Sequence, residues 1–130
     1  MGIANTAVYT ALLAVLLVVL SARVIGVRRS RRISLGDGDD VDLRARIRAH
    51  GNFTEYAPMT LLLMAFAELQ GGPAWLIHAM GLALLVGRLA HAAAVSPVEQ
   101  IMPLRVAGMS LTLATLVVGA IANLVLGFGG

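Results

Sequence analysis

Residues 3–25 read IANTAVYTALLAVLLVVLSARVI, and residues 26–32 read GVRRSRR. The first stretch supplies the roughly 20 mostly apolar residues that a membrane-spanning helix needs. Its basic residues follow the apolar run, whereas in a cleaved signal peptide they precede it. By the positive-inside rule, the arginine-rich segment lies in the cytoplasm and the N-terminus lies outside. The sequence therefore predicts a retained transmembrane helix at the start of the chain.

Three further apolar windows follow, separated by short polar or Gly/Pro breaks. The chain has 130 residues, of which 58% are hydrophobic, so little sequence is left for a soluble domain. We expect one all-α integral membrane domain over residues 1–130, a bundle of four transmembrane helices with both termini on the non-cytoplasmic side. The expected helices cover roughly residues 3–28, 41–69, 74–95 and 98–126. The start of the last is open, because a capping box at Ser96 and a helix-opening Pro103 fit equally well.

The connections carry their own signals. Asp39 or Asp40 can cap the second helix, and residues 70–73, QGGP, predict a tight external turn. The acidic loop before the second helix lacks the spacing and the distal Glu of a calcium loop, so no metal site is expected. The sequence contains no Cys, so any thiol chemistry must use a thiol from another molecule.

Polar residues form a constellation near the cytoplasmic ends of the helices. Arg44, Arg48, Asn52 and Glu55 are spaced by four, four and three residues, which places them on one face of the second helix. Arg88 and His91 are three residues apart in the third helix, and Arg105 lies near the start of the fourth. At 1.5 Å per residue, Arg48, Arg88 and Arg105 each lie about 10 Å from a helix end and could share one level.

Charges embedded in a bilayer cost at least ~2.5 kcal/mol each, so they pair with one another or line a water-filled cavity. Structural pairing of Glu55 with Arg48 or Arg88 is one interpretation, and snorkelling explains Arg23, Arg28 and Arg29. One glutamate cannot neutralise three arginines. The excess of positive charge therefore indicates an anionic ligand, such as a small molecule with carboxylates and an ammonium group.

Three segments resemble one family. Residues 48–58, RAHGNFTEYAP, are similar to the signature segment of the MAPEG family, the membrane-associated proteins of eicosanoid and glutathione metabolism. Residues 86–91, VGRLAH, resemble the third helix of its prostaglandin E synthase branch, and residues 103–105, PLR, resemble the start of its fourth helix. The matches come in the same order as in the family and cover nearly the whole chain, which is similar to the short bacterial members.

The resemblance implies a homotrimer in a bacterial inner membrane that binds glutathione as cosubstrate between neighbouring subunits near the cytoplasmic side. It assigns glutathione binding to seven residues: Arg28 from the adjacent subunit, Arg48, Asn52, Glu55, Tyr56, Arg88 and His91. It also implies that Arg105 is the catalytic residue, because a guanidinium near the thiol stabilises the reactive thiolate. The partners implied are membrane lipid and a lipophilic substrate, and no nucleic acid.

Two positions depart from the family. Val95 stands where several relatives have a Tyr that contacts the thiol region, and Gly51 replaces a basic residue of the prostaglandin branch. We therefore do not expect prostaglandin synthesis, and the sequence does not name the second substrate.

Three functions remain open at this point. The first is a glutathione transferase or peroxidase, and the second is a non-catalytic glutathione-binding module that has lost thiol activation with the Tyr. The third is a small proton-coupled drug exporter that uses Glu55, although the surrounding arginines would repel a cationic drug.

Overall fold

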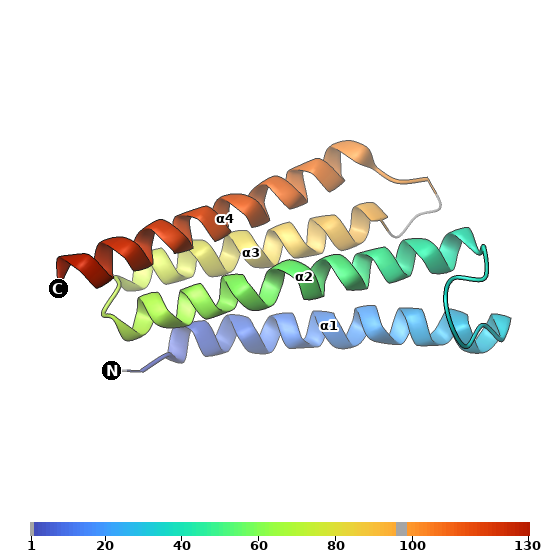
Figure 1. Ribbon diagram of the computed structural model, residues 1–130, viewed down its shortest axis with the longest axis horizontal. Coiled ribbons are helices and arrows are strands. Elements are labelled where there is room, and N and C mark those ends of the chain that lie inside the picture. Colours follow the sequence, from blue (N-terminus) through green and yellow to red (C-terminus); the bar gives the residue numbers. More distant parts are fainter. Residues whose placement is uncertain (1, 96–98) are drawn as a thin grey trace.

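The structure of the chain is a computed structural model, which describes residues 2–95 and 99–130. Its described residues form four helices: α1 (Ala4–Arg31), α2 (Val41–Leu69), α3 (Ala74–Val95) and α4 (Met102–Gly129). The helices run side by side and reverse direction at each connection, so both termini lie at the same end of the bundle (Figure 1). The predicted all-α fold is confirmed.

Local signals set most helix ends. Asp40 caps α2, with its side chain accepting a hydrogen bond of 2.9 Å from the backbone N–H of Leu43. Between α2 and α3, Gly71 adopts a φ of +83°, a conformation that glycine reaches without strain. α2 and α3 have the bounds that the sequence predicts. α1, in contrast, continues three residues beyond the expected residue 28, to Arg31.

The start of α4 differs from the expected residue 98. The helix begins at Met102, which puts Pro103 in its first turn, where a missing backbone N–H costs nothing. Glu99, Gln100 and Ile101 precede the helix. The alternative capping box falls largely on residues 96–98, which lie outside the described residues. Of the two start signals in the sequence, the one at Pro103 agrees with the structure.

Glycines allow the helices to approach closely. A Cβ atom on Gly81 would lie 2.3 Å from the ring of Tyr9, which belongs to α1. In the same way, a Cβ atom on Gly108 of α4 would lie 2.7 Å from the carbonyl oxygen of Gly87 in α3. These distances leave no room for a side chain, so α3 packs directly on both α1 and α4.

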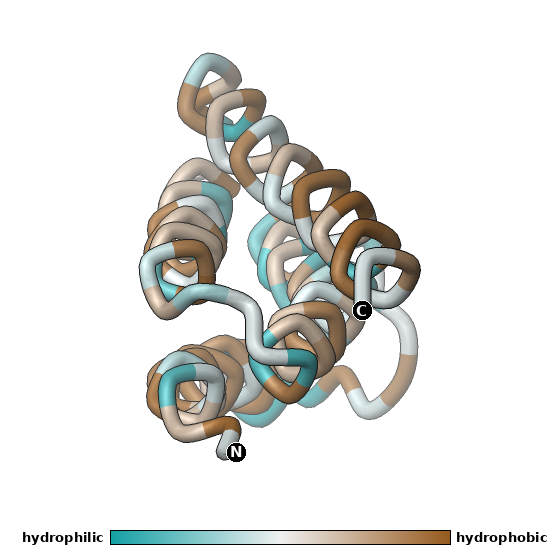
Figure 2. Tube along the Cα trace, turned by 90° about the vertical axis from the view of Figure 1, so that its left-hand side faces the viewer, coloured by the Kyte–Doolittle hydropathy of each residue, from teal (hydrophilic) through white to brown (hydrophobic). Residues whose placement is uncertain are grey.

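Three helices are long and apolar enough to cross a membrane by length and composition: α1, α3 and α4. The 29-residue α2 has similar length, but charged residues crowd its first half. It nevertheless runs alongside the other three helices along the bundle (Figure 1). Large hydrophobic side chains such as Val18, Val117 and Leu124 face outward, and hydrophobic positions follow the outer turns of α4 (Figure 2). This is the surface that a lipid-embedded bundle presents.

Candidate functional site

The most deeply buried charged residue is Arg88, whose side chain is only 2% exposed. Its Nε donates a hydrogen bond of 3.1 Å to Thr112 Oγ1, and one Nη donates to Asn52 Oδ1. The other Nη lies 3.3 Å from Met109 Sδ. No carboxylate within the described residues forms an ion pair with it. Helices α2 and α4 therefore hold this guanidinium of α3 in place with neutral groups alone.

The crossing of α3 and α4 explains why Arg88 lies so deep. Gly87 and Gly108 bring the two backbones into contact directly beside it. Thr112 donates a hydrogen bond of 2.9 Å to the carbonyl oxygen of Gly108, so its hydroxyl proton is already used and its lone pairs face the Arg88 donor. His91 packs against the same crossing and is 3% exposed. The geometry leaves the Arg88 side chain little freedom to reorient.

Arg48 and Glu55 form a second, outward-facing group on α2. The distance from Arg48 Nη2 to Glu55 Oε1 is 3.4 Å, and each side chain is about half exposed, at 51% and 50%. Gly51 lies beneath this pair, because a Cβ there would be 3.3 Å from the Arg48 guanidinium. The predicted face of α2 therefore divides: Asn52 turns inward to Arg88, while Arg48 and Glu55 face the surface of the protomer. Of the two expected partners of Glu55, the structure shows Arg48.

Arg105 lies in the first turn of α4 and donates a hydrogen bond to the side chain of Gln100. His91 follows Arg88 by three residues on α3, and Tyr56 directly follows Glu55 on α2. Because α4 begins at Met102, Arg105 lies three residues from its start, about 4.5 Å along the axis, and not at the depth of about 10 Å expected from the sequence.

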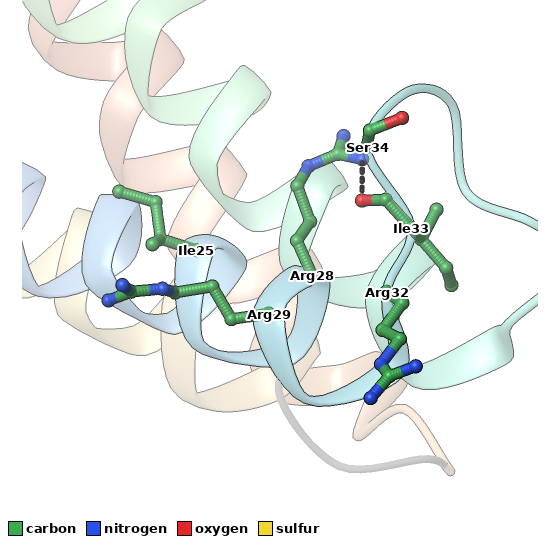
Figure 3. Close-up of a pocket in the computed structure, with 6 residues that line it drawn as sticks. All are labelled: Ile25, Arg28, Arg29, Arg32, Ile33 and Ser34. Atoms are coloured by element: carbon green, nitrogen blue, oxygen red, sulfur yellow. Dashed lines mark hydrogen bonds between the residues drawn. The ribbon is translucent and has the colours of Figure 1, made fainter.

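Arg28 lies apart from this cluster. Its guanidinium folds over the α1–α2 loop and donates hydrogen bonds to the carbonyl oxygens of Ile33, at 3.3 Å, and Gly36, at 2.7 Å (Figure 3). Within the protomer, the structure thus brings together Arg48, Asn52, Glu55, Tyr56, Arg88, His91 and Arg105 and leaves Arg28 at the loop. Arg44, which the spacing placed on the same face, binds Asp37 of the loop instead.

Sequence reasoning missed the residues that hold the arginines: Thr112 and Met109 for Arg88, and Gln100 for Arg105. Thr112 lies seven residues after Arg105, two helical turns along one face of α4, and this spacing is the signal that could have found it. Val95, at the position where several relatives have a Tyr, is fully buried in the core. No phenol therefore comes from this position.

The chemistry of the cluster follows from its composition. It contains three guanidinium groups and one carboxylate, with an amide, an imidazole and a phenol. Guanidinium groups bind carboxylates in bidentate geometry, and a carboxylate binds an ammonium group. In an apolar bundle these interactions gain strength from the low dielectric constant. Groups of these kinds can bind the carboxylates and the ammonium group of a small zwitterion.

The fold and the cluster define a class: a four-helix integral membrane protein with a cationic site set among its helices. Comparison with known proteins gives the family. Residues 6–125 match the model of the MAPEG family. The chain is also 38% identical over 119 residues to the inner membrane protein YecN of Escherichia coli strain K12, covering 92% of this chain and 89% of that protein. YecN of strain O6:H1 (CFT073) matches to the same extent. This chain belongs to the MAPEG family.

Family membership suggests a glutathione-related function in a membrane. The name of the two relatives gives a location and no activity. Their location and the three candidate spans of this chain together support an integral inner-membrane protein.

Proposed function

We propose that this protein is a membrane-bound glutathione transferase or peroxidase. The observation that carries the proposal is the unbalanced positive charge of the site. In the part of the chain that the structure describes, Arg88 and Arg105 have neutral partners only, and the single nearby carboxylate, Glu55, pairs with Arg48. An anionic ligand would supply the missing negative charge.

Glutathione matches the groups present. Its two carboxylates fit the guanidinium groups of Arg48 and Arg88, and its ammonium group fits Glu55. Asn52, Tyr56 and His91 lie within the same cluster and provide neutral polar contacts. Asn52 already accepts a hydrogen bond from Arg88, so it orients that guanidinium toward the ligand as well as contacting it.

The exposed pair of Arg48 and Glu55 supports an oligomer. Glu55 is 14 residues from the start of α2, about 21 Å along the helix axis, which is near its middle. A half-exposed ion pair at this depth would face hydrocarbon in an isolated protomer, at a cost of several kcal/mol. A second subunit that covers it removes this cost. We propose the homotrimer of the family, in which Arg28 of one subunit approaches the Glu55 face of the next.

Arg105 is the proposed catalytic residue. It lies at the N-terminal end of α4, where the helix dipole adds to its positive charge, so a thiolate is stabilised there. In the transferase reaction the thiolate sulfur bonds to an electrophilic carbon, and the leaving group departs with the electron pair of the broken bond. In the peroxidase reaction two glutathione molecules are oxidised to the disulfide, while a hydroperoxide is reduced to an alcohol and water.

The second substrate of the proposed reaction is lipophilic and arrives from the bilayer, because the outer surface of the bundle is apolar. The orientation proposed for the chain follows from its arginines. By the positive-inside rule, the end of α1 that carries four arginines lies in the cytoplasm, and both termini lie on the opposite side. These residues are Arg28, Arg29, Arg31 and Arg32.

A non-catalytic glutathione-binding module is the second candidate, and Val95 favours it. The buried valine provides no hydroxyl to the thiol, and Arg105 hydrogen-bonds to Gln100. This candidate keeps the binding site and loses only the stabilisation of the thiolate.

The experiment that tests the proposal is ultraviolet difference absorbance of the thiolate, during titration of the purified protein with glutathione at neutral pH. The wild type should develop the thiolate band, and Arg105→Ala should lose it while binding glutathione only modestly more weakly. Arg46→Ala is the matched control, because Arg46 is bound to Asp42 at 3.0 Å and takes no part in the proposed site.

The outcomes separate the candidates. Binding without a thiolate band in the wild type would favour the non-catalytic module. If Arg105→Ala weakened glutathione binding as much as it weakened the thiolate band, Arg105 would not be the residue that stabilises the thiolate. If the wild type did not bind glutathione, the proton-coupled drug exporter would become the favoured function.

A further inference from the structure

A hollow at the end of α1 combines an apolar wall with a cationic rim. Ile25 and Arg29 are four residues apart on one face of the helix, and Arg32 is the C-cap residue that ends it, with a left-handed φ of 55°. The hollow has a volume of about 550 Å³ and is lined by Ile25, Arg28, Arg29, Arg32, Ile33 and Ser34 (Figure 3). From Ile25 to Arg32 the chain covers about 10 Å along the helix axis. This length is similar to the distance between the acyl chains of a membrane leaflet and its headgroups.

The carboxylates beside the hollow are already paired with other arginines. Arg31 binds Asp40 and Asp42, Arg44 binds Asp37 and lies 3.8 Å from Asp39, and Arg46 binds Asp42. Arg28 is held by backbone carbonyls of the loop. Arg29 and Arg32 are exposed, and neither guanidinium forms a hydrogen bond or ion pair with a residue that the structure describes. Two guanidinium groups are thus available for an anion at this position.

The surroundings of these two arginines are those of a membrane surface. They come directly after the apolar span of α1, and Leu35 in the following loop is 88% exposed, as expected for a side chain that contacts lipid. Guanidinium groups bind phosphate in bidentate geometry, and basic clusters next to a transmembrane helix attract anionic headgroups. The Arg28 guanidinium points toward the loop, whereas that of Arg29 points away from it (Figure 3). The Arg32 guanidinium points in a third direction (Figure 3), so neither arginine follows Arg28, which the proposed function assigns to glutathione.

We propose that Arg29 and Arg32 bind the phosphate groups of anionic phospholipids, with an acyl chain lying along Ile25. The site does not use Arg28, which lines the same hollow and is assigned to glutathione, and it selects a lipid rather than a soluble anion because the hollow joins apolar and cationic walls. It fixes the depth of α1 in the membrane and favours anionic lipid around the protein.

Native mass spectrometry of the full-length protein in mixed micelles tests this proposal. The wild type should bind phosphatidylglycerol more tightly than phosphatidylcholine with the same acyl chains. The double variant Arg29→Gln/Arg32→Gln should lose this preference, by about five-fold in affinity for each arginine. The control variant Arg31→Gln/Arg44→Gln removes the same charge from the acid-paired arginines and should keep the preference.

Three results would overturn the lipid site: no preference in the wild type, equal losses in the two double variants, or full displacement of the lipid by inorganic phosphate. If the glutamine pair unfolds in phosphatidylcholine micelles, the single variants decide, and unchanged affinity in both would reject the site. Glutathione titration of the Arg29→Gln/Arg32→Gln protein keeps the two proposals distinct. Thiolate formation should be unchanged there, and its loss would reassign the two arginines to glutathione.

Discussion

The two ends of the bundle treat their polar groups in opposite ways. At the end that carries the termini, Glu68 accepts hydrogen bonds from the backbone N–H groups of Asn5 and Thr6 and from the Thr6 hydroxyl. Glu68 therefore accepts the hydrogen bonds of the free backbone N–H groups at the start of α1, because the side chain of the N-cap residue Ile3 has no acceptor. At the other end, Arg48 and Glu55 are half exposed, and the buried Arg88 has only neutral partners among the described residues.

Further pairs close the Glu68 end within the protomer. Tyr9 and His78 share a hydrogen bond of 2.9 Å, and Gln70 donates to Asn123, which in turn donates to the backbone of Leu63. Each interaction ties one helix to another. The polar groups at the Glu68 end thus have partners within the protomer, whereas the positive charge at the arginine end would be neutralised by the ligand or the neighbouring subunit that we propose.

The largest effect should come from breaking the packing of the Glu68 end. In Gly81→Ala the new Cβ would overlap the ring of Tyr9, so we expect a loss of about 3 kcal/mol in the free energy of unfolding. Gly26→Ala is the matched control, because no atom lies within 4 Å of its Cβ position. That variant should be neutral or slightly stabilising. Denaturant unfolding in detergent measures both, and equal stabilities would show that the Gly81 contact relaxes easily.

The next effect concerns the buried support of Arg88. Thr112→Val removes the hydroxyl that accepts the hydrogen bond from Arg88 Nε. A buried charged donor is then left without a partner, which should lower the free energy of unfolding by about 2 kcal/mol. Thr112→Ser keeps the hydroxyl and should retain most of the stability. If Arg88 faces glutathione as proposed, the valine variant should also bind glutathione several-fold more weakly, as measured by titration calorimetry. A valine variant as stable as the serine variant would mean that water or a rearranged side chain replaces Thr112.

A pair of isosteric changes compares the two ends directly. Glu68→Gln removes the charge that stabilises the N-terminus of α1 and should cost about 1 kcal/mol of stability, with glutathione affinity unchanged. Glu55→Gln removes the carboxylate proposed to bind the ammonium group of glutathione, so its main effect should be on binding. It should weaken binding of glutathione far more than binding of an analogue without the amino group. If both variants lowered stability alone, or both lowered glutathione affinity alone, the two ends of the bundle would not differ in role.

The sequence predicted the bounds of the helices better than the side-chain contacts of the site arginines. The turn at residues 70–73 and the Asp40 cap are local signals, so α2 and α3 have the predicted bounds. α1 runs further than expected because arginines form helices well and are favourable near a helix C-terminus. For α4, two local signals competed, and only tertiary structure decides between them.

Helix geometry alone predicted the depth of Arg48 and Arg88, but the depth of Arg105 depended on the start of α4, which the structure puts at Met102. The partners of Arg88 could not be predicted from helix geometry. A threonine in an apolar helix usually bonds to its own backbone, as Thr112 does to Gly108, so its second role toward Arg88 depends on how α3 and α4 cross. The same crossing turns Asn52 inward. Rotation of this kind within a bundle is set by packing between helices rather than by spacing within one.

The smallest effect should appear in the acidic loop that links α1 to α2 at the arginine end. The hydrogen bond from Arg44 and the backbone N–H of Asp39 lower the pKa of Asp37, and the backbone N–H of Leu43 and the Arg31 guanidinium lower the pKa of Asp40. Both pKa values are lower in the folded state, so the unfolded state binds more protons as the pH falls below the usual Asp range. The stabilisation is therefore complete above about pH 4 and disappears as the pH drops through the folded pKa values.

Asp40→Asn sharpens this prediction. Asparagine still caps α2 but cannot titrate, so the decline in stability below about pH 4 should be shallower than in the wild type. Unfolding at a series of pH values in a non-ionic detergent measures the two slopes. Because both aspartates are partly exposed, high salt should reduce the difference as well. Identical slopes would place the acid sensitivity elsewhere, with Glu68 at the closed end as the first residue to test.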